Sequence, residues 1–235
     1  MLTIGLSTFI GIAMNLHAEV VEKSMATAVE DVICVEPGQS SSPYGYVLKM
    51  NLKGQKKVPL LISLHGAGGG KNGVKGMTLG EEQSLSETEF SYVFLKPVCQ
   101  GRWTAEELDK MIESIKMDYA ESIDSNRIYI YGQSMGGYGS WLYCISHGNK
   151  IAAMMSSEGG FIQNTGPVSK YNFEHFKTLP VWVFHNKDDK TVPLNFAMEL
   201  VDSAKAVGGE PKLSLFDTGG HKSRVPDMMK KEVLE

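Results

Sequence analysis

The chain has 235 residues, of which 42% are hydrophobic, and it carries a formal net charge of −4. This length is enough to bury one sizeable core, so one domain is the simplest count. The slightly acidic balance, with no cluster of lysine or arginine, argues against a nucleic-acid partner.

The N-terminal segment, residues 1–18, resembles a secretory signal. It is nearly all apolar or small up to Met14, and Ala18 suits the end of a cleavage site, but the stretch is too short to span a membrane. We therefore expect a secreted or periplasmic protein whose residues 19–235 form one catalytic domain. The alternatives are an upstream extension or a start at Met14, and then a cytoplasmic protein, because the segment has no early lysine or arginine and Leu16 is large for its position.

The cysteine count does not decide between these compartments. Three cysteines, Cys34, Cys99 and Cys144, can supply at most one internal disulfide. Cys144 falls in a helical pattern, where a buried thiol is ordinary.

The first half of the chain predicts short strands and then one amphipathic helix. Strands are expected at Asp31–Glu36 and Tyr44–Asn51, and the continuous apolar runs Val58–Leu64 and Tyr92–Leu95 are typical of strands buried on both faces. A capping box at 104–107 begins the helix. Its apolar face consists of Leu108, Met111, Ile112, Ile115 and Tyr119.

Strands and helices alternate through the second half. This order predicts an α/β fold with a doubly wound, mainly parallel sheet and helices on both faces. Ligands of such sheets bind outside the carboxyl ends of the strands. The expected strands are Ile128–Tyr131, Ile151–Ser156, Pro180–His185 and Lys212–Phe216, and the expected helices are Met135–His147, Pro193–Val207 and Pro226–Leu234.

A G-x-S-x-G motif, Gly132-Gln133-Ser134-Met135-Gly136, joins a predicted strand to a predicted helix. That is the context of a nucleophile elbow, in which the serine is exposed on a sharp turn. The two glycines remove Cβ atoms that would clash in so tight a turn. Ser134 is therefore the expected nucleophile.

A serine nucleophile needs a base, and the base needs an orienting acid. His221 is the favoured base, because it lies in a glycine-flanked loop after the last strand and fits the chain order serine, acid, histidine. Asp189 is preferred as the acid, and its neighbour Asp188 is interpreted as a solvated loop carboxylate. The other histidines after the serine remain alternatives: His147, His175 and His185.

The glycine-rich segment 64–70 follows a buried strand and can aim backbone N–H groups at a developing oxyanion. The amides of Ala67 and Met135 are the expected donors. A phosphate-binding loop is the rival interpretation. A phosphate-binding P-loop requires a lysine and a serine or threonine after its glycines, and these are missing at that spacing. A G-x-G-x-x-G pattern with a later acid is also missing. We therefore expect no cofactor and no metal.

Together these residues resemble the α/β-hydrolase superfamily. Within it they are most similar to single-domain esterases grouped with prolyl-oligopeptidase-like predicted peptidases, polyhydroxybutyrate depolymerases and feruloyl esterases. The resemblance runs from about Val58 to Ser223 and implies the same roles for Ser134, Asp189 and His221. It rests on 64–68, 96–99 with Trp103, 132–139, 180–185 with Asp189, and 220–221. Further candidates for substrate contact are His65, Gly66, Gln133, Trp103 and Phe161.

The sequence departs from that pattern in three places. Asn186 stands where a glycine is common, and Arg224 stands where a tryptophan is common, which predicts a more polar wall of the site. Only 14 residues follow His221, so a short last helix is expected.

The segment between Ser156 and Pro180 is about two dozen residues long, too short for a large cap domain. Its aromatic side chains either form the lip of an open cleft or anchor the loop to the core. These side chains, with one isoleucine, are Phe161, Ile162, Tyr171, Phe173 and Phe176.

An open cleft favours bulky esters, so we expect a serine esterase of the feruloyl or acetyl-sugar type, acting on a small-molecule or polysaccharide-linked ester. The first alternative is a prolyl-oligopeptidase-like serine peptidase in which Glu158 holds a free amine. The second is a non-catalytic binding protein on the same fold. The sequence leaves the oligomeric state open.

Overall fold

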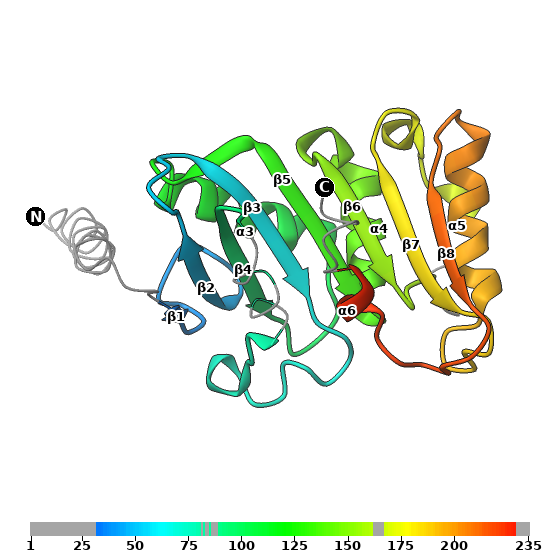
Figure 1. Ribbon diagram of the computed structural model, residues 1–235, viewed down its shortest axis with the longest axis horizontal. Helices are drawn as coiled ribbons and strands as arrows, with labels where there is room; N and C mark the ends of the chain where they lie inside the picture. Colours follow the sequence, from blue (N-terminus) through cyan, green and yellow to red (C-terminus); the bar gives the residue numbers. More distant parts are fainter. Residues whose placement is uncertain (1–31, 81, 83–84, 86–88, 162–166, 229–235) are drawn as a thin grey trace, which may run out of the picture.

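A computed structural model describes residues 32–80, 82, 85, 89–161 and 167–228 of the chain. Its centre is an eight-stranded sheet with the order β1-β2-β4-β3-β5-β6-β7-β8 (Figure 1). The possible signal at residues 1–18 lies outside the described residues. The strands are β1 Val32–Val35, β2 Gly45–Asn51, β3 Val58–Leu64, β4 Tyr92–Val98, β5 Ile123–Gln133, β6 Ala153–Ser157, β7 Val181–Asn186 and β8 Lys212–Phe216. The α-helices are α3 Ala105–Asp118, α4 Met135–His147, α5 Leu194–Ala206 and α6 Val225–Met228, and the 3-10 helices are η1 Val74–Gly76, η2 Gly148–Lys150, η3 Val168–Lys170 and η4 Glu174–Lys177.

The sheet is mainly parallel, as predicted. β1 and β2 form an antiparallel pair, and β2 is antiparallel to β4. The pairs from β4 through β3, β5, β6 and β7 to β8 are all parallel. The carboxyl ends of these six strands therefore meet along one edge, where the loops that carry the candidate residues begin.

Helices cover both faces of the sheet, which confirms the predicted α/β-hydrolase type of architecture. α3, α4 and α5 lie on one face over the larger apolar core, and α6 lies on the opposite side (Figure 1). A smaller apolar cluster on that second side includes Leu85, Phe94 and Tyr131. The described part of the predicted helix Pro226–Leu234 falls in α6.

The N-terminal cap and the apolar face predicted for α3 are confirmed, although the structure shows only one of the two hydrogen bonds of a capping box. The Thr104 hydroxyl accepts a hydrogen bond from the Glu107 amide at 3.2 Å, which satisfies one of the unpaired donors at the start of the helix. The five apolar residues predicted for its buried face are at most 3% exposed.

Two strands are longer than predicted, and both differences come from pairing partners. β4 continues through Pro97, beyond Leu95, where its described pairing with β3 ends. A proline, which lacks an N–H, is tolerated where one neighbouring strand is missing. β5 begins at Ile123 because that residue pairs with Val58 across a register shift, despite the polar residues between Ile123 and Ile128.

None of the helices in the described residues combines the length and apolar character needed to cross a bilayer. The three cysteine thiols are unpaired, with Cys34 exposed and the other two buried. Cys34, Cys99 and Cys144 therefore form no disulfide in this structure.

Candidate active site

Ser134 occupies the turn between β5 and α4 in a conformation that few non-glycine residues adopt. Its φ is 56° and its ψ is −116°, and its amide donates to the Ser157 carbonyl at 2.9 Å. A backbone held in this region stores strain and recurs at functional sites. The structure thus has the sharp strand–turn–helix geometry that the motif predicted.

The motif glycines are required by the close approach of the α4 N-terminus to the sheet. A Cβ atom on Gly136 would lie 1.9 Å from the Leu64 carbonyl oxygen, and one on Gly132 would lie 2.3 Å from the Gly136 carbonyl carbon. Both neighbours are backbone atoms of packed elements and cannot move away. The elbow therefore accepts no side chain at either position.

Three of the predicted residues form one hydrogen-bonded chain. His221 Nε2 lies 2.8 Å from Ser134 Oγ, and His221 Nδ1 lies 2.6 Å from Asp189 Oδ2. Asp189 is buried in the loop after β7, and the His221 side chain is 22% exposed. This is the geometry in which an imidazole can take the serine proton while the carboxylate fixes its tautomer.

The surroundings of Asp189 favour its ionised form. Burial alone would raise the pKa of this carboxyl, but the hydrogen bonds it accepts outweigh burial and hold the pKa below its ordinary value. One oxygen accepts from His221, and the other accepts from the amides of Thr191 and Val192 at 2.8 and 3.0 Å. Asp189 is therefore fixed as an acceptor before any substrate arrives.

Asp188 does not contact the imidazole, but it is more than the solvated loop carboxylate that the sequence suggested. Its oxygens accept from the amides of Gly219 and Gly220 at 3.3 and 2.7 Å. The Gly220 amide is the main reason that the pKa of this exposed carboxyl is lowered. Asp188 thus holds the loop that carries His221.

The alternative histidines lie away from the serine. His147 sits at the end of α4 with its Nε2 3.8 Å from Asp109. His175 packs against Gly148. His185 is fully buried, and its Nε2 donates to the Val192 carbonyl at 2.8 Å.

The loop after β3 is held against the elbow by His65. The ring Nδ1 donates to the Gly66 carbonyl at 2.8 Å, and Nε2 accepts from the Cys99 amide at 3.0 Å, which fixes the tautomer. A Cβ atom on Gly66 would lie 3.4 Å from Ser134 Cβ, so the loop backbone passes directly beside the serine. The loop is thus close enough to contribute a donor to the site.

The two expected oxyanion donors flank this contact. Met135 is the first residue of α4, so its amide has no acceptor within the helix. Ala67 follows Gly66 in the exposed part of the loop. In the described part of the chain, neither amide takes part in a turn or ladder hydrogen bond.

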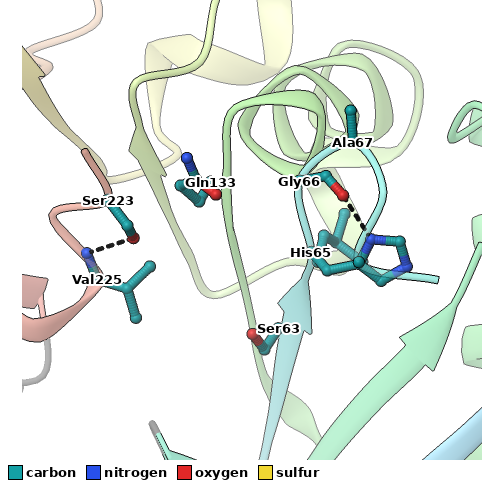
Figure 2. Close-up of a pocket in the computed structure, with 9 residues that line it drawn as sticks. Ser63, His65, Gly66, Ala67, Gln133, Ser223 and Val225 are labelled. Carbon is teal, nitrogen blue, oxygen red and sulfur yellow. Dashed lines mark hydrogen bonds between the residues drawn. The ribbon is translucent and has the colours of Figure 1, made fainter. Parts of the chain in front are cut away.

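A pocket of about 300 Å³ opens next to this loop. Figure 2 shows Ser223 and Val225 on one side of it and His65, Gly66 and Ala67 on the other, with Gln133 between them. Three of the predicted substrate-contact residues, His65, Gly66 and Gln133, therefore line one pocket. Its polar side chains include Ser63, Gln133 and Ser223.

Two other predicted substrate-contact residues are corrected by their burial. Trp103 is 1% exposed, and its indole N–H donates to the His65 carbonyl at 3.1 Å. This side chain therefore supports the loop after β3 from the core. Phe161 is 3% exposed and packs edge-on against Tyr138 and Tyr171 with ring centroids 5.1 and 5.0 Å apart. Neither presents a surface to a substrate.

The described aromatics of the segment after β6 anchor it to the core. Phe173 and Phe176 are buried like Phe161, so they do not form the lip of a cleft, while Ile162 lies outside the described residues. Glu158 is also fully buried and is in no position to hold a substrate amine. Arg224 does not add a free polar wall, since its guanidinium donates to Asn186 Oδ1 and to the Thr218 carbonyl.

Glu158, His185 and Asp189 have one potential metal-binding atom each within 4.8 Å of one another. His185 Nε2 is the nitrogen that faces both carboxylates, at 3.7 and 3.8 Å. The Val192 carbonyl can only accept, so this nitrogen carries a hydrogen and is not a metal ligand in this arrangement. The three side chains therefore form a buried polar cluster.

The phospholipase/carboxylesterase family profile matches residues 99–233, more than half of the chain. The chain belongs to this family of α/β-hydrolases. No curated protein matches the sequence.

Solved structures share this fold. A thermostable esterase superposes with a TM-score of 0.66 and 26% identity, over 87% of this chain and 61% of the esterase. An acylaminoacyl peptidase from Pyrococcus horikoshii superposes with a TM-score of 0.61 and 15% identity, over 86% of this chain and 39% of the peptidase. Dipeptidyl peptidase 4 from Porphyromonas gingivalis superposes with a TM-score of 0.63 and 12% identity, over 82% of this chain and 32% of the peptidase. This chain thus spans less than two thirds of each structure, and the two peptidases establish the fold alone.

Sequence reasoning did not predict the contacts among the side chains that surround the candidate residues. Glu158, Asn186 and Ser157 end neighbouring strands, and each bonds to the loop around His221 or to another of these side chains. Asn186 and Arg224 stood out only as departures from a familiar pattern. That signal marked the right positions without giving their role.

Proposed function

We propose that this protein is a serine esterase that works through an acyl-enzyme on Ser134. The observation that carries the proposal is the hydrogen-bonded chain from Ser134 Oγ through His221 to Asp189 on a strained elbow. The family description and the likeness to a thermostable esterase support ester hydrolysis as the reaction.

In the proposed mechanism, Ser134 Oγ attacks the ester carbonyl carbon while His221 Nε2 takes its proton. The carbonyl oxygen becomes an oxyanion, which the Ala67 and Met135 amides stabilise. Collapse of this intermediate breaks the bond to the alcohol, which leaves with the proton from His221. Water then attacks the acyl-enzyme by the same route and releases the acid and free Ser134.

We further propose that the substrate carries a hydroxylated group, as in acylated or feruloylated sugars. The pocket beside the loop after β3 supports this, because it offers polar side chains from Ser63, Gln133 and Ser223, and Gln133 directly precedes Ser134 in the chain. Its volume of about 300 Å³ is at the lower end of the usual range for ligand sites, which suits one sugar-sized group. Glu158, the residue considered as an anchor for a peptide amine, is buried and so does not support the peptidase alternative.

Labelling with a fluorophosphonate tests the nucleophile directly. Wild-type protein should be labelled at Ser134, and Ser134→Ala should lose labelling together with roughly 10⁴- to 10⁶-fold in kcat, with the fold unchanged by circular dichroism. An alanine variant that still hydrolyses a short aryl ester at the wild-type rate would transfer the role elsewhere. An unlabelled wild-type protein would favour a non-catalytic binding protein.

A further inference from the structure

Glu158 is a buried carboxyl group that the mechanism above does not use. It follows β6 directly, is 0% exposed, and has a φ of 50°, which is uncommon for a residue other than glycine. Its amide donates to the Phe184 carbonyl at 2.9 Å, which ties it to β7. A strained, fully buried acid next to a candidate triad requires a physical reason for being there.

The first part of that reason is the contact between Glu158 and Asp189. Glu158 and Asp189 each place a carboxyl oxygen within 4.8 Å of the other. Two ionised carboxylates repel each other at such a distance in a buried place, so the pair retains one proton. Asp189 already accepts from His221 and from two backbone amides, which leaves Glu158 as the group that keeps the proton.

The second part is the contact between Glu158 and Asn186. Glu158 Oε1 accepts from Asn186 Nδ2 at 2.6 Å, and Oε2 accepts from the Asn186 amide at 3.3 Å. The same Nδ2 donates to the carbonyls of Gly220 and Lys222 at 2.9 and 3.2 Å. These are the residues on either side of His221, so Glu158 orients the side chain that holds the histidine backbone.

The other end of Asn186 is fixed as well. Its Oδ1 accepts from Arg224, whose guanidinium also donates to the Thr218 carbonyl and stacks over the Phe216 ring at 3.8 Å. The Arg224 amide in turn donates to Ser157 Oγ at 2.7 Å. The loop with His221 is therefore bound from both its ends to a network that starts at Glu158.

We propose that Glu158 is a positioning residue that stays protonated at neutral pH, donates this proton to Asp189, and through Asn186 sets the place of His221. This inference rests on the proposed serine esterase function. Loss of the proton would put a second negative charge beside Asp189, break their hydrogen bond and disturb the loop. Activity should then fall as Glu158 ionises.

The surroundings of Glu158 set the pH at which this happens. Burial and the hydrogen bond with Asp189 raise the pKa of Glu158 to about 8, while the Asn186 amide and the charge of Arg224 oppose that rise. In the described part of the chain, the charged or titratable groups that face it are Asp189, Arg224 and His185, with His221 beyond Asp189. Burial lowers the pKa of His185, so this ring stays neutral over the same range.

Substitution by glutamine separates the proton from the charge. The amide of Glu158→Gln can donate to Asp189 and accept from Asn186 at every pH, so this variant mimics the protonated acid. Hydrolysis of a neutral ester is followed by pH-stat. We expect the kcat/KM of the wild-type protein to fall as the pH rises, with a midpoint near pH 8. The kcat/KM of Glu158→Gln should stay high to a pH at least one unit above that midpoint. Glu158→Ala should lose roughly 10²-fold already at pH 7, because the histidine is misplaced.

The matched control is Glu121→Gln, which changes an exposed glutamate far from this network and should leave the profile as in the wild type. The inference is overturned if Glu158→Gln falls with the wild-type midpoint or is as damaged as Glu158→Ala at pH 7. Fluorophosphonate labelling of Ser134 at pH 7 keeps the two proposals apart. If the wild-type protein is not labelled, the proposed esterase function is rejected. If it is labelled but the pH midpoint of Glu158→Gln equals that of the wild type, only the role of Glu158 is rejected.

A second measurement does not depend on the variants. The infrared carbonyl band of a protonated carboxyl group should be present in the wild-type protein at pH 7 and should titrate away with a midpoint near pH 8. Its absence at pH 7 would overturn the inference even if Glu158→Gln did not fold.

Discussion

At the scale of single residues, two neighbours in the chain have different partners. Asp189 is buried and accepts from the His221 ring, whereas Asp188 is exposed and accepts from the amides of Gly219 and Gly220. Both carboxylates therefore act on one histidine, Asp189 through the ring and Asp188 through the backbone. The sequence favoured Asp189 over Asp188 as the partner of His221, and the structure has the Asp189 contact. The sequence did not predict that Asp188 binds the backbone of the same loop.

Asparagine substitutions should distinguish these two parts. Asp189→Asn should lower kcat by roughly 10⁴-fold, because an amide in place of the carboxylate favours the wrong histidine tautomer. Asp188→Asn should cost less than about tenfold, since its amide oxygen can still accept from the Gly220 N–H. Steady-state kinetics at neutral pH compare them, and equal or reversed losses would contradict the assignment.

At the scale of elements, the elbow depends on how closely α4 approaches β3. The Leu64 carbonyl occupies the space where a side chain at Gly136 would begin, so the helix start can pack against the strand only with a glycine there. The Gly66 backbone also passes close to Ser134, the residue before Met135. The fold thus builds the serine and its expected oxyanion donors as one unit.

Gly136→Ala should therefore damage stability and activity together. Because the clash is with backbone, we expect a loss of more than about 3 kcal/mol in the free energy of unfolding, at or above the upper end of overpacking costs. Urea unfolding measures this. Gly101→Ala, whose Cβ would meet nothing within 4 Å, is the matched control. Similar stability of the two variants would show that α4 can shift away from β3.

At the scale of the whole molecule, six parallel strands bring distant segments to one edge of the sheet. The segments after β3, β5, β6, β7 and β8 carry, in that order, the glycine-rich loop expected to hold the oxyanion, Ser134, Glu158, the two aspartates and His221. The pocket of about 300 Å³ lies at this same edge. Substrate choice is therefore expected to depend on the loop after β8, which carries both His221 and Ser223.

This arrangement predicts a preference for esters over amides. An amide needs exact protonation of a poor leaving group and a pocket that anchors the peptide, whereas an alcohol leaves readily from a stabilised oxyanion. For matched p-nitrophenyl ester and p-nitroanilide substrates, kcat/KM should favour the ester by roughly 10²- to 10⁴-fold. Preference for the anilide would support a peptidase.

The same comparison extends to the pocket. Acetylated or feruloylated sugars should be hydrolysed with a lower KM than the matching methyl esters, and Ser223→Ala should reduce that difference by removing a polar side chain from the pocket. A variant that loses activity equally on both kinds of ester would argue that Ser223 supports the loop and does not contact substrate.

Local patterns in the sequence determined much of this protein. The alternation of apolar runs with amphipathic segments specified a mainly parallel α/β sheet, because strand and helix periods differ and are visible in a single chain. The Thr104 cap and the elbow motif were also readable, since each depends on residues a few positions apart. Chain order then pointed to His221 and Asp189, which the structure brings within hydrogen-bonding distance of one another.

Other features were decided only by the tertiary structure. Strand ends at β4 and β5 follow from pairing partners far away in the chain, and Phe161 and its aromatic neighbours are buried by core residues from other elements. From the sequence, Glu158 was considered only as a holder of a substrate amine, because an exposed loop carboxylate and a buried acid look alike in sequence. Its role depends on burial and on neighbours from β7 and β8, which only folding brings together.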